Sequence, residues 1–107
     1  MKRVAFQMKV KKEQLKEYVK WHKNVWPEMI EALKRNDWTN YSLFMRKDGL
    51  IFGYVEVPDS FSFALDRMSE EEINDKWQTL MAPYFEIPDG THPDENMIEL
   101  EEIFHIN

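Results

Sequence analysis

The fold is most clearly indicated by the run WTNYSLFMRKDGLIFGYVEV, residues 38–57. Its two halves, residues 38–46 and 50–57, predict two strands. Between them, Lys-Asp-Gly at 47–49 is a hairpin signal, because glycine takes the positive φ that a tight turn requires. Pro58 ends the second strand, since proline cannot donate a hydrogen bond to a ladder. A β-hairpin therefore lies in the middle of the chain.

A strand and an amphipathic helix precede the hairpin. The period-2 alternation of a strand with one apolar face is carried by Val4, Phe6, Met8 and Val10. From Lys12 onward, apolar side chains recur every three or four residues, which is typical of a helix with one apolar face. Pro27 interrupts this helix, because its ring displaces the hydrogen bond to Lys23. We expect two helical pieces, residues 12–23 and 27–36, with a kink or turn between them.

Helical segments also follow the hairpin. Ser60 is a candidate cap for a short helical stretch. Ser69 and Glu72 have the spacing of a capping box, which predicts the start of a longer helix that contains Trp77. Pro83 disturbs the last turn of that helix, since it lacks the backbone donor.

The end of the chain completes the order of elements. Residues 86–95 contain two prolines, a glycine and several acids, and predict a loop; residues 97–106 predict a fourth strand. The order β-α-β-β-α-β is that of a ferredoxin-like domain, the split β-α-β form of an α+β fold. We expect one domain over residues 1–107, because the chain is shorter than the roughly 150 residues usual for a domain.

In such a fold the helices cover one face of the sheet and leave the other face open. The strands at 38–46, 50–57 and 97–106 lack a clean polar side, so the open face carries apolar residues as well. An uncovered apolar sheet implies a partner. Sheet-to-sheet homodimerisation is the simplest solution, and it encloses a pocket between sheet and helix or between sheets.

The composition restricts partners and compartment. A net charge of −6 repels phosphate backbones and anionic lipid, so we expect neither nucleic-acid nor membrane binding. The chain has no cysteine, which excludes a disulfide, a thiol nucleophile and a cysteine-ligated metal. Neither the apolar core of a signal peptide nor a long apolar run appears, so we expect a cytoplasmic protein.

His22 is the most informative single residue. On an ideal helix it lies within the apolar stripe, with Tyr18 one turn before it. Two interpretations are open: a core histidine satisfied by hydrogen bonds, or a proton-transfer group in a half-apolar pocket. Together with His22, the aromatic residues Tyr18, Tyr41 and Trp77 suit a ligand with one apolar face and several hydroxyls, which describes a sugar.

Metal and nucleotide chemistry have little support. The chain's three histidines, His22, His92 and His105, share no metal-ligand spacing. Glu70, Glu71 and Glu72 fit the first turn of a helix better than a metal site, and the chain lacks a glycine-rich phosphate loop. We therefore expect no metal and no cofactor.

The chain resembles the L-rhamnose mutarotase family along nearly its whole length. The most specific part is Tyr18, His22 and the Trp-Pro-Glu run at 26–28, after a strand that contains Ala-Phe-Gln-Met at 5–8. Further likeness lies in Asn40-Tyr41, Val55-Glu56, Lys76-Trp77 with Met81, and the closing Glu-Leu-Glu-Glu-Ile-Phe at 99–104. The resemblance implies a ferredoxin-like subunit that forms a dimeric α+β barrel.

The resemblance also implies an activity, the interconversion of the α and β anomers of L-rhamnose without a cofactor. His22 matches the family's proton donor, Tyr18 and Tyr41 match substrate-contacting tyrosines, and Trp77 matches the first residue of a Trp-Trp pair that contacts sugar. Gln78 stands where the second Trp of that pair is expected, which leaves the identity of the sugar open.

Three other hypotheses remain. The enzyme acts on a related deoxy sugar or another aldose, or the protein is a sugar-binding dimer without catalysis. A third is a cofactor-free oxygenase or haem-handling enzyme on the same architecture, which rests on analogy of fold alone.

Overall fold

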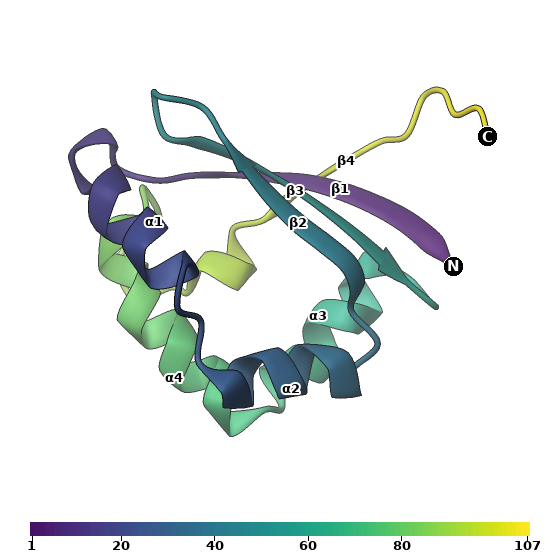
Figure 1. Cartoon of the computed structure of the whole chain (residues 1–107), viewed down its shortest axis with the longest axis horizontal. Coiled ribbons are helices and arrows are strands. Elements are labelled where there is room, and N and C mark those ends of the chain that lie inside the picture. The colour runs from purple at the N-terminus through teal and green to yellow at the C-terminus, as the bar shows by residue number, and fades with distance from the viewer.

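An antiparallel sheet with strand order β2-β3-β1-β4 forms one layer of the molecule, and four helices form the other (Figure 1). The computed structural model describes residues 1–107. The strands are β1 (Lys2–Lys9), β2 (Thr39–Met45), β3 (Leu50–Val57) and β4 (Ile98–Leu100). The helices are α1 (Leu15–His22), α2 (Pro27–Arg35), α3 (Phe61–Ser69) and α4 (Glu72–Met81). Three single turns of 3₁₀-helix are η1 (Lys12–Gln14), η2 (Ala82–Tyr84) and η3 (Pro93–Glu95). The predicted ferredoxin-like α+β fold is confirmed.

The central hairpin forms as predicted. Gly49 has φ of 98° and donates its N–H to the Arg46 carbonyl at 3.0 Å, while Arg46 N–H donates to the Leu50 carbonyl at 2.8 Å. A Cβ at Gly49 would run into the carbonyl oxygen of Val10, so both backbone conformation and close approach require glycine here.

The two helical breaks at proline are confirmed. α1 ends at His22, and α2 begins at Pro27, which occupies the first helical turn where a missing N–H leaves no bond unmade. α4 ends at Met81, and the turn η2 with Pro83 follows it. The Ser60 cap is also confirmed, because its hydroxyl accepts a hydrogen bond from Phe63 N–H at 3.0 Å.

The predicted capping box of Ser69 and Glu72 is wrong. Ser69 is the last residue of α3, and its hydroxyl donates to the Asp66 carbonyl at 2.6 Å. The residue before α4 is Glu71, which makes no side-chain cap. The serine fits its place at a helix end, since hydroxyls there readily bond back to the preceding turn.

The fourth strand is much shorter than the predicted 97–106. Only Ile98–Leu100 pairs with β1, with Leu100 opposite Ala5. At that register residues 101–103 would lie opposite residues 2–4 of β1, but they leave the sheet, and beyond residue 103 β1 offers no residue to pair with. Residues 101–107 are exposed and extend away from the body of the molecule (Figure 1).

The inner face of the sheet, which the helices cover, holds the core. Side chains on β1 alternate, so that Val4, Phe6 and Met8 are buried. Phe6 stacks on Phe61 of α3 with ring centroids 5.0 Å apart. Gly53 lies opposite Phe6 in the register, and a Cβ there would collide with the Phe6 ring. None of the four helices has both the length and the apolar character of a membrane span.

Candidate active site

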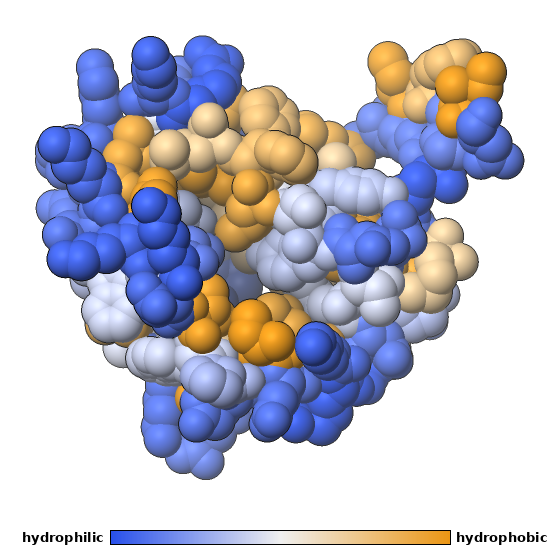
Figure 2. Space-filling model, in the orientation of Figure 1, coloured by the Kyte–Doolittle hydropathy of each residue, from blue (hydrophilic) through white to orange (hydrophobic).

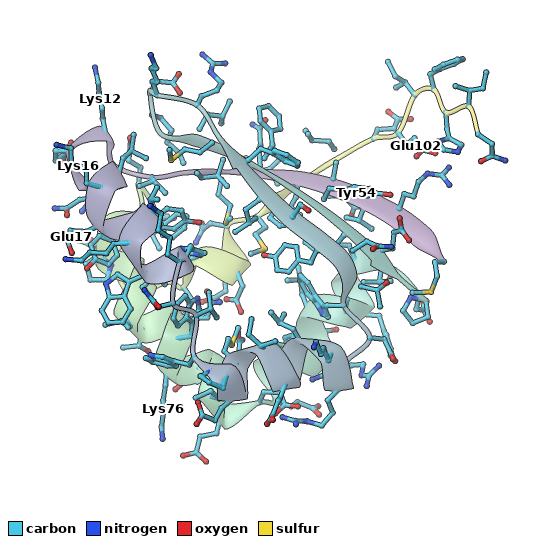
Figure 3. The ribbon with its side chains drawn as sticks, viewed as in Figure 1. Lys12, Lys16, Glu17, Tyr54, Lys76 and Glu102 are labelled. Atoms are coloured by element: carbon cyan, nitrogen blue, oxygen red, sulfur yellow. The ribbon has the colours of Figure 1, made fainter.

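A cavity of about 340 Å³ lies between the inner face of the sheet and the helices. Figure 2 shows the hollow in the middle of one side of the molecule, with hydrophobic side chains on its rim. Of the nineteen residues that line it, fourteen are hydrophobic, so the few polar groups define what it binds. Those polar groups belong to Tyr18, His22, Tyr41, Asn74, Gln78 and Asp94. The volume and the lining are typical of a small-molecule site.

His22 stands at the end of α1 with one ring nitrogen held and the other free. Its Nδ1 is 2.9 Å from the Tyr18 carbonyl oxygen. Because a carbonyl only accepts, Nδ1 carries the proton in the neutral ring and Nε2 keeps its lone pair. Burial lowers the pKa of His22, and the hydrogen bond to Tyr18 partly offsets this effect. At neutral pH the ring is therefore chiefly neutral and able to accept a proton at Nε2.

Aromatic rings fix the orientation of the imidazole. The Tyr18 ring centroid lies 4.2 Å from that of His22, and the Trp77 ring meets it edge-to-face at 5.6 Å. Tyr18 and His22 also border a smaller cavity of about 190 Å³ next to β2. The structure thus places His22 beside open space rather than sealing it among aliphatic neighbours.

The hydroxyls of Tyr18 and Tyr41 are available to a ligand. Both side chains line the large cavity, and neither hydroxyl has a hydrogen-bond partner within the protein. Burial raises the pKa of both phenols, and the nearby Asp94 adds to the effect on Tyr41. Both groups therefore stay protonated and can each donate one hydrogen bond.

Trp77 of α4 is almost wholly buried and contributes a wall of the cavity. Trp21 and Trp26 pack edge-to-face against it at centroid distances of 6.3 and 5.1 Å. Trp21 in turn donates from Nε1 to the Tyr84 hydroxyl at 3.1 Å. All four side chains that the sequence singled out, Tyr18, His22, Tyr41 and Trp77, come from three elements to one cavity.

The sequence analysis did not predict that three polar residues line the cavity. Asn74 and Gln78 are four residues apart on α4, and Asp94 belongs to η3. Asn74 Nδ2 donates to Asp94 Oδ2 at 3.1 Å, Asp94 N–H donates to Gln78 Oε1 at 3.0 Å, and Gln78 Nε2 donates to Asn74 Oδ1 at 3.2 Å. Burial raises the pKa of Asp94, partly offset by the Asn74 amide. The four-residue spacing of two amides on an apolar helix face was the available signal.

The remaining histidines lie apart from this cavity. His92 Nδ1 is 4.0 Å from Asp75 Oδ1, and His105 Nε2 is 3.0 Å from Asn107 Oδ1. No group of three His, Cys, Asp or Glu side chains is placed to hold a metal ion.

Fold and cavity together define a class of protein. It is a ferredoxin-like domain with a titratable imidazole in a half-apolar pocket of the size that holds a small ligand. The comparisons with known proteins then narrow this class to one family.

The sequence profile of the L-rhamnose mutarotase family matches residues 3–106. An L-rhamnose mutarotase of Oceanobacillus iheyensis is 36% identical, with 100% of both chains covered. One of Listeria monocytogenes is 38% identical, with 99% of both chains covered. The crystal structure of an L-rhamnose mutarotase from Formosa agariphila superposes with a TM-score of 0.81 at 30% identity and 100% coverage of both chains. The chain belongs to the L-rhamnose mutarotase family, isomerases that interconvert the anomers of L-rhamnose.

Proposed function

We propose that this chain, as a single domain over residues 1–107, catalyses the interconversion of α- and β-L-rhamnose in the cavity beside His22. The observation that carries the proposal is the free Nε2 of His22, which borders the same cavity as the two unpaired hydroxyls of Tyr18 and Tyr41. Family membership supplies the reaction, and the side chains present suit it.

The only chemistry that the protein must supply for this reaction is proton transfer. In ring opening, the C1–O5 bond breaks and its electron pair stays on O5, which takes up a proton. The anomeric O1–H gives up its proton, and the C1–O1 bond becomes a carbonyl. Rotation about C1–C2 presents the other carbonyl face, and closure reverses both transfers. Positioned acid–base catalysis contributes about 10²–10⁴-fold, which suffices for a reaction that already proceeds unaided in water.

In this proposal His22 is the catalytic residue, and it exchanges a proton with the sugar at Nε2. The tautomer held by the Tyr18 carbonyl is the form that accepts a proton there, and the imidazolium is the form that returns it. Tyr18 and Tyr41 donate hydrogen bonds to sugar hydroxyls, and Trp77 offers an apolar wall for a ring face or the methyl group of a 6-deoxy sugar. The proposal requires no cofactor and no metal.

Gln78 favours a second candidate, a related deoxy sugar or another aldose as the preferred substrate. Its side chain is buried and bonded to Asn74 and Asp94, so this part of the wall presents amides and a carboxyl group rather than an indole. Hydroxyl contacts discriminate between substrates more strongly than contacts with a methylene group.

Anomer exchange measured by saturation-transfer NMR over a panel of aldoses tests both candidates. Fastest exchange with L-rhamnose supports the first, and faster exchange with another aldose supports the second. Binding of a sugar without any acceleration between pH 5 and pH 8 would instead mark a sugar-binding protein without catalysis.

We further propose that the protein is a cytoplasmic homodimer joined through the outer face of its sheet. This face is the side of β1–β4 away from the helices, and its apolar residues Phe44, Phe52 and Ile98 are 62%, 36% and 59% exposed. Ile103 and Phe104 in the C-terminal segment are 90% and 79% exposed. A second copy would bury both sets of residues in one symmetric interface. Sedimentation velocity across protein concentrations measures the oligomeric state directly.

A further inference from the structure

Asp94 is held in the cavity wall by a closed ring of hydrogen bonds. Its backbone N–H donates to Gln78, its Oδ2 accepts from Asn74, and the two amides bond to each other. The turn that carries it, η3, lies under the sheet next to α4 (Figure 1). Buried Pro93 and the reciprocal bonds of His92 and Glu95 fix this turn.

This arrangement leaves one oxygen of the carboxyl group unengaged. Oδ2 is bonded to Asn74, whereas Oδ1 has no hydrogen-bond partner within the protein, and Asp94 lines the same cavity as His22. Asp94 is half-buried and Oδ1 is not sealed from solvent, so a ligand or water in the cavity can reach this oxygen.

We propose that Asp94 is a second catalytic residue, which exchanges one proton with the bound sugar while His22 exchanges the other. The proposal rests on the proposed mutarotase activity. It supplies the partner that the reaction requires, because ring opening needs one group to give a proton and another to take one. Asn74 and Gln78 are then positioning residues that aim the carboxyl group.

The charged groups around Asp94 suit this role. Apart from His22 the cavity wall contains no basic side chain, so burial favours the protonated carboxylic acid. The neighbours that affect its charge are His92 and Glu95 on its own turn and the Tyr41 phenol on β2. His92 favours the ionised form, whereas Glu95 favours the protonated form.

Burial brings the pKa values of Asp94 and His22 closer together. The pKa of Asp94 is raised and that of His22 is lowered, so the energies of the two ways of placing a single proton on the pair approach each other. With one proton on the pair, the cavity offers one donor and one acceptor. After ring closure each group has recovered its starting state, and no oxidant or reductant takes part.

Asp94→Asn is the direct test, because asparagine keeps the size and the acceptor for Asn74 but cannot exchange a proton. We expect anomer exchange to fall by about 10²-fold or more, with little change in sugar binding measured by tryptophan fluorescence. The rate of the unaltered protein should follow a bell-shaped pH profile, and Asp94→Asn should reduce it to a single ionisation. Asp89→Asn is the matched control and should leave rate and profile unchanged, since Asp89 is exposed in the same loop and lies outside the cavity lining.

A second measurement does not depend on the folding of the Asp94 variant. The carboxyl carbon of Asp94 is titrated by NMR in the unaltered protein and in His22→Gln. If the two groups face one cavity, removal of the imidazolium raises the pKa of Asp94; an unchanged pKa overturns the proposal. Equal exchange rates for the unaltered protein and Asp94→Asn overturn it as well and leave the mutarotase activity standing. An inactive unaltered protein overturns the proposed function itself, and this proposal with it.

Discussion

The two faces of the sheet differ in how completely the rest of the chain covers their apolar residues. On the inner face, Phe6, Gly53 and Phe61 fit one another closely, and the helices enclose both the core and the cavity. On the outer face, Phe44 lies opposite Phe52 in the register, and both rings are exposed. The inner face is therefore complete within one chain and can hold a site of fixed geometry, whereas the outer face leaves apolar rings in solvent, as the proposed dimer interface requires.

Loss of the Phe6 ring should destabilise the fold more than any other change described below. Phe6→Ala removes a fully buried ring that packs on Phe61 and Tyr41, and should lower the free energy of unfolding by about 3–5 kcal/mol. Phe44→Ala, on the exposed side, should cost less than about 0.5 kcal/mol in the monomer. Urea unfolding at low protein concentration measures both; equal losses would show that the two faces do not differ as described.

Gly53→Ala tests the close fit of the inner face. Because the added Cβ meets the Phe6 ring, overpacking should cost about 1–3 kcal/mol. Phe6→Leu makes room for the added Cβ. The double variant of Gly53→Ala and Phe6→Leu should therefore be more stable than the sum of the two single losses predicts. Strictly additive losses in a double-mutant cycle would contradict the collision.

Phe52→Glu tests the outer face. A charge in the middle of the proposed interface should raise the dimer dissociation constant at least about tenfold, because it would be buried without a partner, while the circular dichroism spectrum stays the same. Phe63→Glu is the matched control, since Phe63 is 47% exposed on α3 and lies outside the sheet. Sedimentation velocity decides, and a monomeric unaltered protein at every concentration would remove the outer face as an interface.

A weaker change is expected in the acid stability of the helical layer. Hydrogen bonds from Arg35 and Asn36 lower the pKa of Glu71 to about 2. A lowered carboxyl pKa stabilises the fold above the unfolded value near 4.5, and this contribution is lost as the pH falls toward 2. Glu71→Gln should therefore show a weaker loss of stability over that range; parallel pH curves in thermal unfolding would contradict the assignment.

Local sequence signals predicted the central hairpin and the first two helices well. The turn at 47–49 and the break at Pro27 depend on the conformations of glycine and proline, which the neighbouring chain hardly alters. Helical periodicity placed His22 on the inward side of α1, because the spacing of side chains around a helix depends on local geometry alone. Ser69 was misplaced because α3 continues through it, and the spacing of a capping box does not reveal where the preceding helix ends.

What the sequence could not predict depends on contacts between distant segments. β4 ends at Leu100, opposite Ala5, although the alternation continues over 97–106 and β1 extends to Lys2. Asp94 enters the cavity only because η3 docks on Asn74 and Gln78, sixteen or more residues earlier. A loop rich in proline and acid gives no indication of such docking.

The proposed function requires that the inner face enclose a site where His22 passes protons to a bound sugar. Exchange between the anomers of L-rhamnose, followed by saturation-transfer NMR with the unaltered protein and with His22→Gln, tests it most directly. We predict faster exchange than in buffer with the unaltered protein, and loss of nearly all of that acceleration in the variant at unchanged sugar affinity. Equal acceleration by both proteins would contradict the claim.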